Sequence, residues 1–114
     1  MTGIGIDLLD IARLERALDR RPNLARRLFT ERELADCRAR ARPAMHLAAR
    51  FCAKEAVVKA LGLDHCPWQE IEITSGPLGE PLVKVSERVS SGTARVVISL
   101  THERQIAGAV AVAG

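Results

Sequence analysis

Residues 50–62 read Arg-Phe-Cys-Ala-Lys-Glu-Ala-Val-Val-Lys-Ala-Leu-Gly and lie in the longest helix that the sequence predicts. We expect this helix over residues 44–61, because Pro43 fits the first turn of a helix and Gly62 is a natural helix stop. Most of the segment is alanine or a large apolar residue, which suits a helix that packs in a core. The charged residues within it are therefore candidates for function.

Four charged side chains of this helix form two pairs with i, i+4 spacing, Arg50 with Lys54 and Glu55 with Lys59. Side chains with this spacing share one helix face. A solvated Glu–Lys pair, the commoner role on an isolated helix, contributes only about 0.2–0.5 kcal/mol to helix stability. A functional role is also open, since Glu55 can bind a hard cation and Lys59 can neutralise a phosphate oxygen.

Residues 3–9 alternate with a period of two, which predicts a β-strand near the start of the chain. One face of this strand carries Ile4, Ile6 and Leu8. The other face carries Gly3, Gly5 and Asp7. We expect this second face to be open, with space beside Asp7 for a ligand or an ion. A structural role in capping the next helix is equally open for Asp7.

A short helix is expected from residue 11, with Asp10 as its N-terminal cap. Four arginines lie along or just after this helix: Arg13, Arg16, Arg20 and Arg21. A basic stripe is usually a solvated face, but this clustering also suits the docking of an acidic partner. A capping box from Thr30 to Glu33 predicts a further short helix that ends near residue 40.

After the long helix the pattern favours strands near residues 70–74, 82–85, 95–100 and 106–112. We place His102 in the turn between the last two strands, where its ring can reach a ligand, although a lone loop histidine is more often incidental. These elements predict an α+β fold with a mostly antiparallel sheet, a long central helix and shorter helices packed on it. Residues 1–114 are expected to form a single domain.

The charge is concentrated in the first half of the chain. Lys and Arg total 17 against 14 Asp and Glu, and 14 of the 17 basic residues are arginine. A basic half indicates a phosphate-rich or acidic partner. An aromatic content of 3% is unlike proteins that stack single-stranded bases on aromatic rings, but it does not exclude a protein that grips duplex phosphates.

Other features of the sequence bear on where the protein works. No apolar run approaches the roughly 18 residues of a membrane-spanning helix, and the N-terminus lacks the pattern of a secretory signal. The three cysteines include no C-x-x-C pair, so neither a disulfide framework nor a zinc knuckle is indicated. We therefore expect a cytoplasmic protein with no membrane association.

Three segments, in this order, resemble holo-acyl-carrier-protein synthase, the small class of 4′-phosphopantetheinyl transferases: residues 3–7, 50–62 and 99–102. The middle segment is specific, and the resemblance covers nearly the whole chain. It implies that coenzyme A donates its 4′-phosphopantetheine arm to a serine of an acidic apo acyl carrier protein, with Mg²⁺, releasing adenosine 3′,5′-bisphosphate. It also implies a homotrimer with sites between subunits, and no role in binding nucleic acid.

The resemblance further assigns residue roles. Asp7 and Glu55 would hold the metal, with Glu55, directly or through a water, as the base for the serine. Glu55, Lys59 and His102 would be the catalytic residues, with His102 supplied by a neighbouring subunit. The resemblance places several residues at the coenzyme A site: Arg50, Lys54, Lys59, Gly62, Pro81, Thr101 and His102. It places the carrier protein on Arg13, Arg16, Arg20 and Arg21.

The sequence departs from the family at several positions. Leu63 and Asp64 follow the helix stop, where the family usually has a small polar residue and a glycine. Only residues 86–93 are available for an amphipathic helix of the family, so we expect that helix to be short or missing. Two other functions stay open: a non-catalytic basic module that binds nucleic-acid phosphates, and a degenerate subunit that binds coenzyme A or a carrier protein without turnover.

Overall fold

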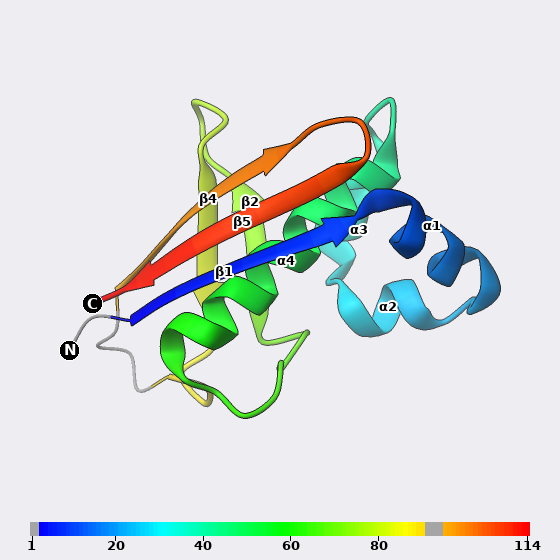
Figure 1. Ribbon diagram of the computed structural model, residues 1–114. Helices are drawn as coiled ribbons and strands as arrows, with labels where there is room; N and C mark the ends of the chain where they lie inside the picture. Colours follow the sequence, from blue (N-terminus) through cyan, green and yellow to red (C-terminus); the bar gives the residue numbers. More distant parts are fainter. Residues whose placement is uncertain (1–2, 91–94) are drawn as a thin grey trace.

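The computed structural model describes residues 3–90 and 95–114. In these residues the elements follow the order β1 (Gly3–Asp10), α1 (Ile11–Arg20), α2 (Leu24–Leu28), α3 (Glu31–Arg38), α4 (Pro43–Leu61), β2 (Ile71–Ser75), β3 (Pro81–Val85), β4 (Val96–His102) and β5 (Ile106–Ala113). The strands form a three-stranded sheet, β1-β5-β4, and a two-stranded sheet, β2-β3, and every pairing is antiparallel. Helix α4 lies across one face of the larger sheet (Figure 1). The expected α+β fold is confirmed.

The helix limits follow the predicted caps. The carboxylate of Asp10 accepts a hydrogen bond of 3.0 Å from the second residue of α1. Thr30 and Glu33 form the complete capping box of α3. Helix α4 begins at Pro43 and ends at Gly62, whose φ of 71° is the left-handed conformation that glycine adopts readily. Within the described parts of the chain, no helix has the length and apolar character needed to cross a membrane.

Strand β1 crosses α4 at very short range because two of its residues lack a side chain. A Cβ atom at Gly3 would lie 1.9 Å from the carbonyl oxygen of Ala60, and one at Gly5 would lie 2.0 Å from that of Ala56. From Gly3 to Gly5 the strand advances about 6.6 Å, and from Ala60 to Ala56 the helix advances about 6 Å in the same direction. Because these two distances are nearly equal, each glycine meets one turn of the helix. The expectation of an open glycine face is wrong, because this face is packed on the helix.

We expect Gly5→Ala to damage both stability and activity. Its new methyl group would meet the backbone of Ala56, which cannot rotate away, so β1 must move off α4. Overpacking of this kind costs about 1–3 kcal/mol of unfolding free energy. Gly108→Ala is the matched control for stability, because there the methyl would meet the end of the Leu8 side chain, 2.8 Å away, which can shift. Urea unfolding of both variants and a transfer assay on Gly5→Ala test this, and equal losses of stability in the two variants would contradict the close-crossing argument.

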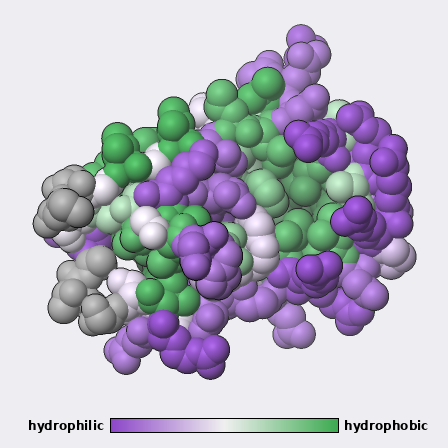
Figure 2. Space-filling model, turned by 60° about the horizontal axis from the view of Figure 1, so that its bottom comes forward, coloured by the Kyte–Doolittle hydropathy of each residue, from purple (hydrophilic) through white to green (hydrophobic). Residues whose placement is uncertain are grey.

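The opposite face of the larger sheet exposes apolar side chains. Ile4, Ile6 and Leu8 of β1 are 71%, 64% and 67% exposed. The strand register continues this surface across the sheet, since Ile4 is opposite Val112, which is opposite Val97. In Figure 2 hydrophobic groups follow β1 along the upper edge of the molecule. We refer to this surface, formed by Ile4, Ile6, Leu8, Val97, Ile106 and Val112, as the outer sheet face.

Two expectations for the C-terminal half need correction or stay open. Strand β4 continues to His102, which lies opposite Ala107, and the hairpin closes through a 2.9 Å hydrogen bond from the Glu103 N–H to the Ile106 carbonyl. The placement of His102 in the turn is therefore wrong, because the ladder continues to that residue. The expectation that a helix over residues 86–93 is short or missing agrees with residues 86–90, which form turns and no helix, and it stays open for residues 91–93, which lie outside the described ones.

Candidate active site

The crossing of β1 and α4 brings together three of the predicted site residues. Asp7 follows Gly5 on the strand face that packs on the helix, where it lies beside Glu55 and Lys59. The Lys59 Nζ is 3.5 Å from the Asp7 Oδ1 and donates a hydrogen bond of 2.8 Å to the Ile6 carbonyl. The Lys59 side chain is 52% exposed and that of Asp7 is 20% exposed. The cluster is thus fixed by the backbone of β1 and open to solvent.

The charges of this cluster are incompletely balanced. Burial raises the pKa of Glu55, the negative charge of Asp7 raises it further, and Lys59 counteracts only part of the effect. Burial, together with Asp7 and then Glu55, raises the pKa of the adjacent Cys52 thiol to about 12, so this thiol stays neutral. Two carboxylates therefore share one ammonium group, and an added cation would relieve their repulsion.

The donor set of this cluster fits one type of metal ion. Across residues 3–90 and 95–114, no three or more His, Cys, Asp or Glu side chains gather as a metal site. Asp7 and Glu55 alone cannot enclose an ion that requires a complete protein cage, such as structural zinc. Two carboxylates with phosphate and water as the other ligands are typical of Mg²⁺. The residues present thus fit the expected magnesium.

A second group of predicted residues surrounds a cavity of about 220 Å³ between α4, the β2–β3 hairpin and β4. Arg50 and Pro81 both line it, together with Gly79 and Ser99. The Arg50 guanidinium is 3.6 Å from Asp36 and donates a hydrogen bond of 3.4 Å to the Glu33 carbonyl. These contacts hold a buried cation at the wall of a polar cavity.

His102 and Thr101 lie apart from the Asp7–Glu55–Lys59 cluster. The ring of His102 contacts His46 of α4, with the ring centroids 5.5 Å apart. Nine residues separate His46 from Glu55, which corresponds to about 14 Å along the helix axis. Thr101 is opposite Gly108, in the cross-strand row of Leu8, and so lies on the outer sheet face. One chain by itself does not bring His102 to the Asp7 and Glu55 carboxylates.

Lys54 is not at this site, so its expected contact with the cofactor is wrong. Its side chain is fully buried, and its Nζ lies 2.7 Å from the Glu33 carboxylate, also fully buried. The same ammonium donates hydrogen bonds to the carbonyls of Leu28 and Trp68, at 2.9 and 2.6 Å. All three of its protons are therefore used inside the protein, and none is left for a phosphate.

An apolar groove adjoins the carboxylates and was missed by the sequence analysis. It has a volume of about 470 Å³ and runs from Asp7 and Glu55 to α1 and α2. Its apolar lining consists of Leu8, Leu9, Leu14, Ala17, Leu24, Leu28 and Phe51. Figure 2 shows a hydrophobic hollow bordered by hydrophilic groups. In the sequence these residues look like ordinary core positions, and only the fold reveals that they leave a gap.

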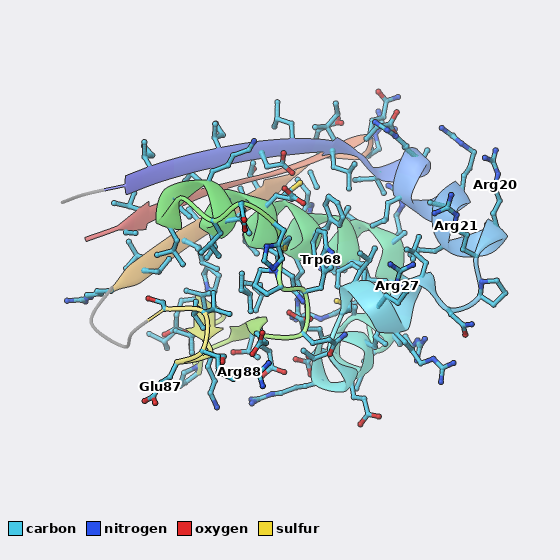
Figure 3. The ribbon with its side chains drawn as sticks, turned by 90° about the horizontal axis from the view of Figure 1, so that it is seen from below. Arg20, Arg21, Arg27, Trp68, Glu87 and Arg88 are labelled. Atoms are coloured by element: carbon cyan, nitrogen blue, oxygen red, sulfur yellow. The ribbon has the colours of Figure 1, made fainter. Side chains whose placement is uncertain are left out.

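The remaining predicted residues lie on the surface. Arg13, Arg16, Arg20 and Arg21 are all exposed, and Arg13 also lines the apolar groove. Figure 3 shows Arg20 and Arg21 at the same end of the molecule as Arg27 of α2. Gly62 is exposed at the end of α4, three residues after Lys59. Nearby, the exposed Asp64 carboxylate is 2.6 Å from the His65 ring, and this contact lowers the pKa of Asp64.

The site combines two carboxylates and a lysine at a strand–helix crossing with a cavity lined by an arginine. These groups are typical of a small enzyme that catalyses phosphoryl transfer. Residues 3–111 match the model of the 4′-phosphopantetheinyl transferase superfamily, and the chain belongs to this family. It is 48% identical to a curated holo-[acyl-carrier-protein] synthase of Moorella thermoacetica, covering 97% of this chain and 92% of that protein. The resemblance to holo-acyl-carrier-protein synthases is thus confirmed, and the class is an enzyme rather than a nucleic-acid-binding module.

Solved structures agree with this assignment. The crystal structure of a holo-[acyl-carrier-protein] synthase from Neisseria meningitidis superposes with a TM-score of 0.88 at 30% identity, covering 98% of this chain and 97% of the other. A Bacillus anthracis holo-(acyl-carrier-protein) synthase in complex with CoA (3′,5′-ADP) superposes with a TM-score of 0.83, also at 30% identity, covering 97% and 94% of the two chains.

Proposed function

We propose that this chain transfers the 4′-phosphopantetheine arm of coenzyme A to a serine of apo acyl carrier protein. The observation that carries the proposal is the Asp7–Glu55–Lys59 cluster at the β1–α4 crossing. Phosphoryl transfer needs positioned groups that offset negative charge, and this cluster combines a cation-binding pair with a lysine. The proposal extends to residues 1–114 as one domain, and the three free thiols support a reducing, cytoplasmic setting.

The reaction joins the serine oxygen to the phosphorus of coenzyme A that carries the pantetheine arm. The bond from this phosphorus to the bridging oxygen breaks, and adenosine 3′,5′-bisphosphate leaves. The serine proton passes to Glu55, directly or through a water. The half-exposed Lys59 ammonium meets the charge on the transferred group.

Asp7 and Glu55 would hold Mg²⁺, which when bound neutralises charge on the pyrophosphate. We assign the nucleotide end of coenzyme A to the cavity of Arg50 and Pro81, because its buried guanidinium suits a phosphate group of the ligand. His102 and Thr101 belong to the same end, and Gly62 to the pyrophosphate end beside Lys59. The complex of the Bacillus anthracis protein with CoA (3′,5′-ADP) supports this co-substrate.

The carrier protein is assigned to the exposed arginines of α1 and the groove beside them. We expect reversal of Arg13 and Arg16 to glutamate to raise the KM for carrier protein at least about tenfold, because opposed rim charges chiefly slow association. The affinity for coenzyme A should change little, since neither residue touches the Arg50 cavity. Steady-state kinetics with each substrate varied in turn, repeated in high salt, tests this docking role. Equal losses for both substrates would contradict it.

The outer sheet face supports a homotrimer with sites between subunits. Three side chains of β1 on this face are each more than 60% exposed, which is unusual for adjacent large apolar residues. A second copy covering this face would bury them. It would also allow His102 of one subunit to approach the Asp7–Glu55 cluster of its neighbour, which a single chain does not achieve.

Ile6→Lys should therefore prevent assembly and stop transfer. A lysine in the middle of this face places a charge at the proposed interface, where desolvation is costly. Leu78→Lys is the matched control, because Leu78 is 92% exposed but lies in the β2–β3 turn, away from this face. Light scattering coupled to size-exclusion chromatography gives the oligomeric state. An Ile6→Lys protein with unchanged mass in solution and full activity would contradict the proposed interface.

The activity itself is tested with purified protein, coenzyme A, Mg²⁺ and apo acyl carrier protein. Intact-mass spectrometry should detect the added phosphopantetheine arm on the carrier protein, and chelation of the metal should prevent it. The control is a carrier protein whose acceptor serine is replaced by alanine. Absence of the added mass on several apo carrier proteins, with the enzyme folded, would refute the proposal.

A further inference from the structure

A second imidazole lies beside His102, and the proposed reaction gives it no role. His46 of α4 and His102 of β4 meet edge to face, with ring planes at 78° and centroids 5.5 Å apart. Along α4, His46 is four residues before Arg50, so these two basic groups share one helix face. Arg42 lies just before α4 as its N-cap residue. It donates a hydrogen bond to the carbonyl of Arg104, just after the end of β4.

Positive charge is crowded around His46. Burial lowers its pKa, and Arg40, His102 and Arg50 lower it further. These groups come from the segment before α4, from β4 and from α4 itself. One acidic group on this side, Asp36 of α3, is 3.6 Å from Arg50 and is paired with it. An imidazole in such a setting is neutral near pH 7, and an arriving anion would favour its protonated form.

We propose that His46 belongs to the coenzyme A site and takes up a proton from solvent when a phosphate monoester binds near His102 and Arg50. This inference rests on the proposed function. Coenzyme A carries a pyrophosphate and a ribose phosphate monoester. In the proposed reaction Lys59 and the metal meet the charge of the pyrophosphate, which leaves the monoester for the histidine end. A phosphate monoester has a second pKa near 6 and a charge of about −2 at neutral pH, so it suits a site with surplus cations.

Imidazole resonances give a direct test. The chain has three histidines, His46, His65 and His102, so three Cε1–H signals can be followed by NMR and assigned with single His→Phe variants. Coenzyme A should move the titration midpoint of His46 upward by about one pH unit, a tenfold change in its proton affinity. Dephospho-coenzyme A, which lacks the monoester, should leave that midpoint unchanged. His65, whose side chain is 80% exposed in another loop, should not respond to either ligand.

Binding measurements on His46→Phe give an independent readout. Phenylalanine keeps an aromatic ring against His102 but cannot take up a proton. By linkage, a one-unit shift makes coenzyme A binding weaker in the variant at low pH, approaching about tenfold well below the midpoint of His46 in the free protein, with little difference near pH 8.5. The titration of the phosphate itself is common to both proteins and cancels in this comparison. His65→Phe is the matched control and should bind coenzyme A as the unmodified protein does.

Several results would overturn the proposal. The proposal is wrong if coenzyme A does not change the titration midpoint of His46. It is also wrong if dephospho-coenzyme A shifts this midpoint as much as coenzyme A does. A loss of affinity in His46→Phe that is the same at every pH, or the same for both ligands, would show a structural role instead. Transfer measured on the same protein separates these results from the proposed function. If unmodified protein transfers the arm while His46 fails these tests, only the present inference is lost.

Discussion

Glu55→Gln is expected to abolish transfer and, at the same time, to make the protein more stable at neutral pH. Glutamine has the same shape but is a weak ligand for a hard cation and cannot accept the serine proton. Loss of a general base alone lowers the rate about 10²–10⁴-fold, and loss of the metal adds to this. Stability should rise because burial and Asp7 penalise the ionised form of Glu55, and glutamine carries no charge.

The pH dependence of this stabilisation follows from the direction of the pKa shift. The pKa of Glu55 in the folded protein is raised above its ordinary value of 4.5. Between these two values the folded protein binds more protons than the unfolded one, so its stability falls as the pH rises through this window. The gain from Glu55→Gln should therefore be complete above the raised pKa and absent below about pH 4.

Thermal unfolding at several pH values, with and without Mg²⁺, measures both parts of this prediction. Mg²⁺ should raise the unfolding temperature of the unmodified protein by mass action and have little effect on Glu55→Gln. Glu87→Gln is the matched control, because Glu87 is exposed in the turn after β3, on the opposite side of the molecule from β1 (Figure 3). Transfer within a few-fold of the unmodified protein, or a variant that is less stable at pH 7, would contradict the assignment of Glu55.

Lys54→Met should cost about 3–5 kcal/mol of unfolding free energy, the typical penalty for removing one partner of a buried ion pair. The Glu33 carboxylate is fully buried, and after this change it would retain only the backbone N–H groups of Thr30 and Ile73, each at 2.7 Å. The carbonyls of Leu28 and Trp68 would also lose their donor. Such a loss is a large fraction of the stability of a domain of this size.

Lys59→Met provides the contrast on the same helix. Its ammonium is half exposed beside Asp7, so its removal should cost less than about 1 kcal/mol of stability while greatly slowing transfer. Urea unfolding and kinetics on both variants distinguish the structural role of Lys54 from the proposed catalytic role of Lys59. Adding Glu33→Gln to Lys54→Met should recover part of the lost stability, because no buried charge is then left unpaired. A small loss in Lys54→Met would refute the role of this ion pair.

The sequence predicted the elements well because their end signals are local. Asp10, the Thr30–Glu33 box, Pro43 and Gly62 each mark a helix end through contacts with nearby residues. The closeness of Asp7 and Glu55 came from resemblance, since no local pattern shows that residues 48 positions apart will meet. The structure supplies the physical reason, which is that the two glycines let β1 cross α4 in step with the helix turns.

The mistaken expectation for Lys54 has a clear origin. Spacing along α4 shows that Lys54 and Glu55 are neighbours, but consecutive helix residues point about 100° apart. Lys54 consequently faces the core and Glu33, a partner supplied by α3. His46 was missed for the related reason that its importance depends on β4, although its i, i+4 spacing with Arg50 is visible in the sequence. In both cases the role of the residue depends on a contact with another element, α3 for Lys54 and β4 for His46.

The position of β1 in its sheet has a consequence for how the protein folds. Within the described residues, the hydrogen-bonded neighbour of β1 is β5, and Asp7 is opposite Ala109. The larger sheet therefore depends on contacts between residues about a hundred positions apart, and such contacts form slowly because a long loop must close first. Deletion of β5 would leave β1 without its partner strand, and we expect such a variant to lose the ordered position of Asp7.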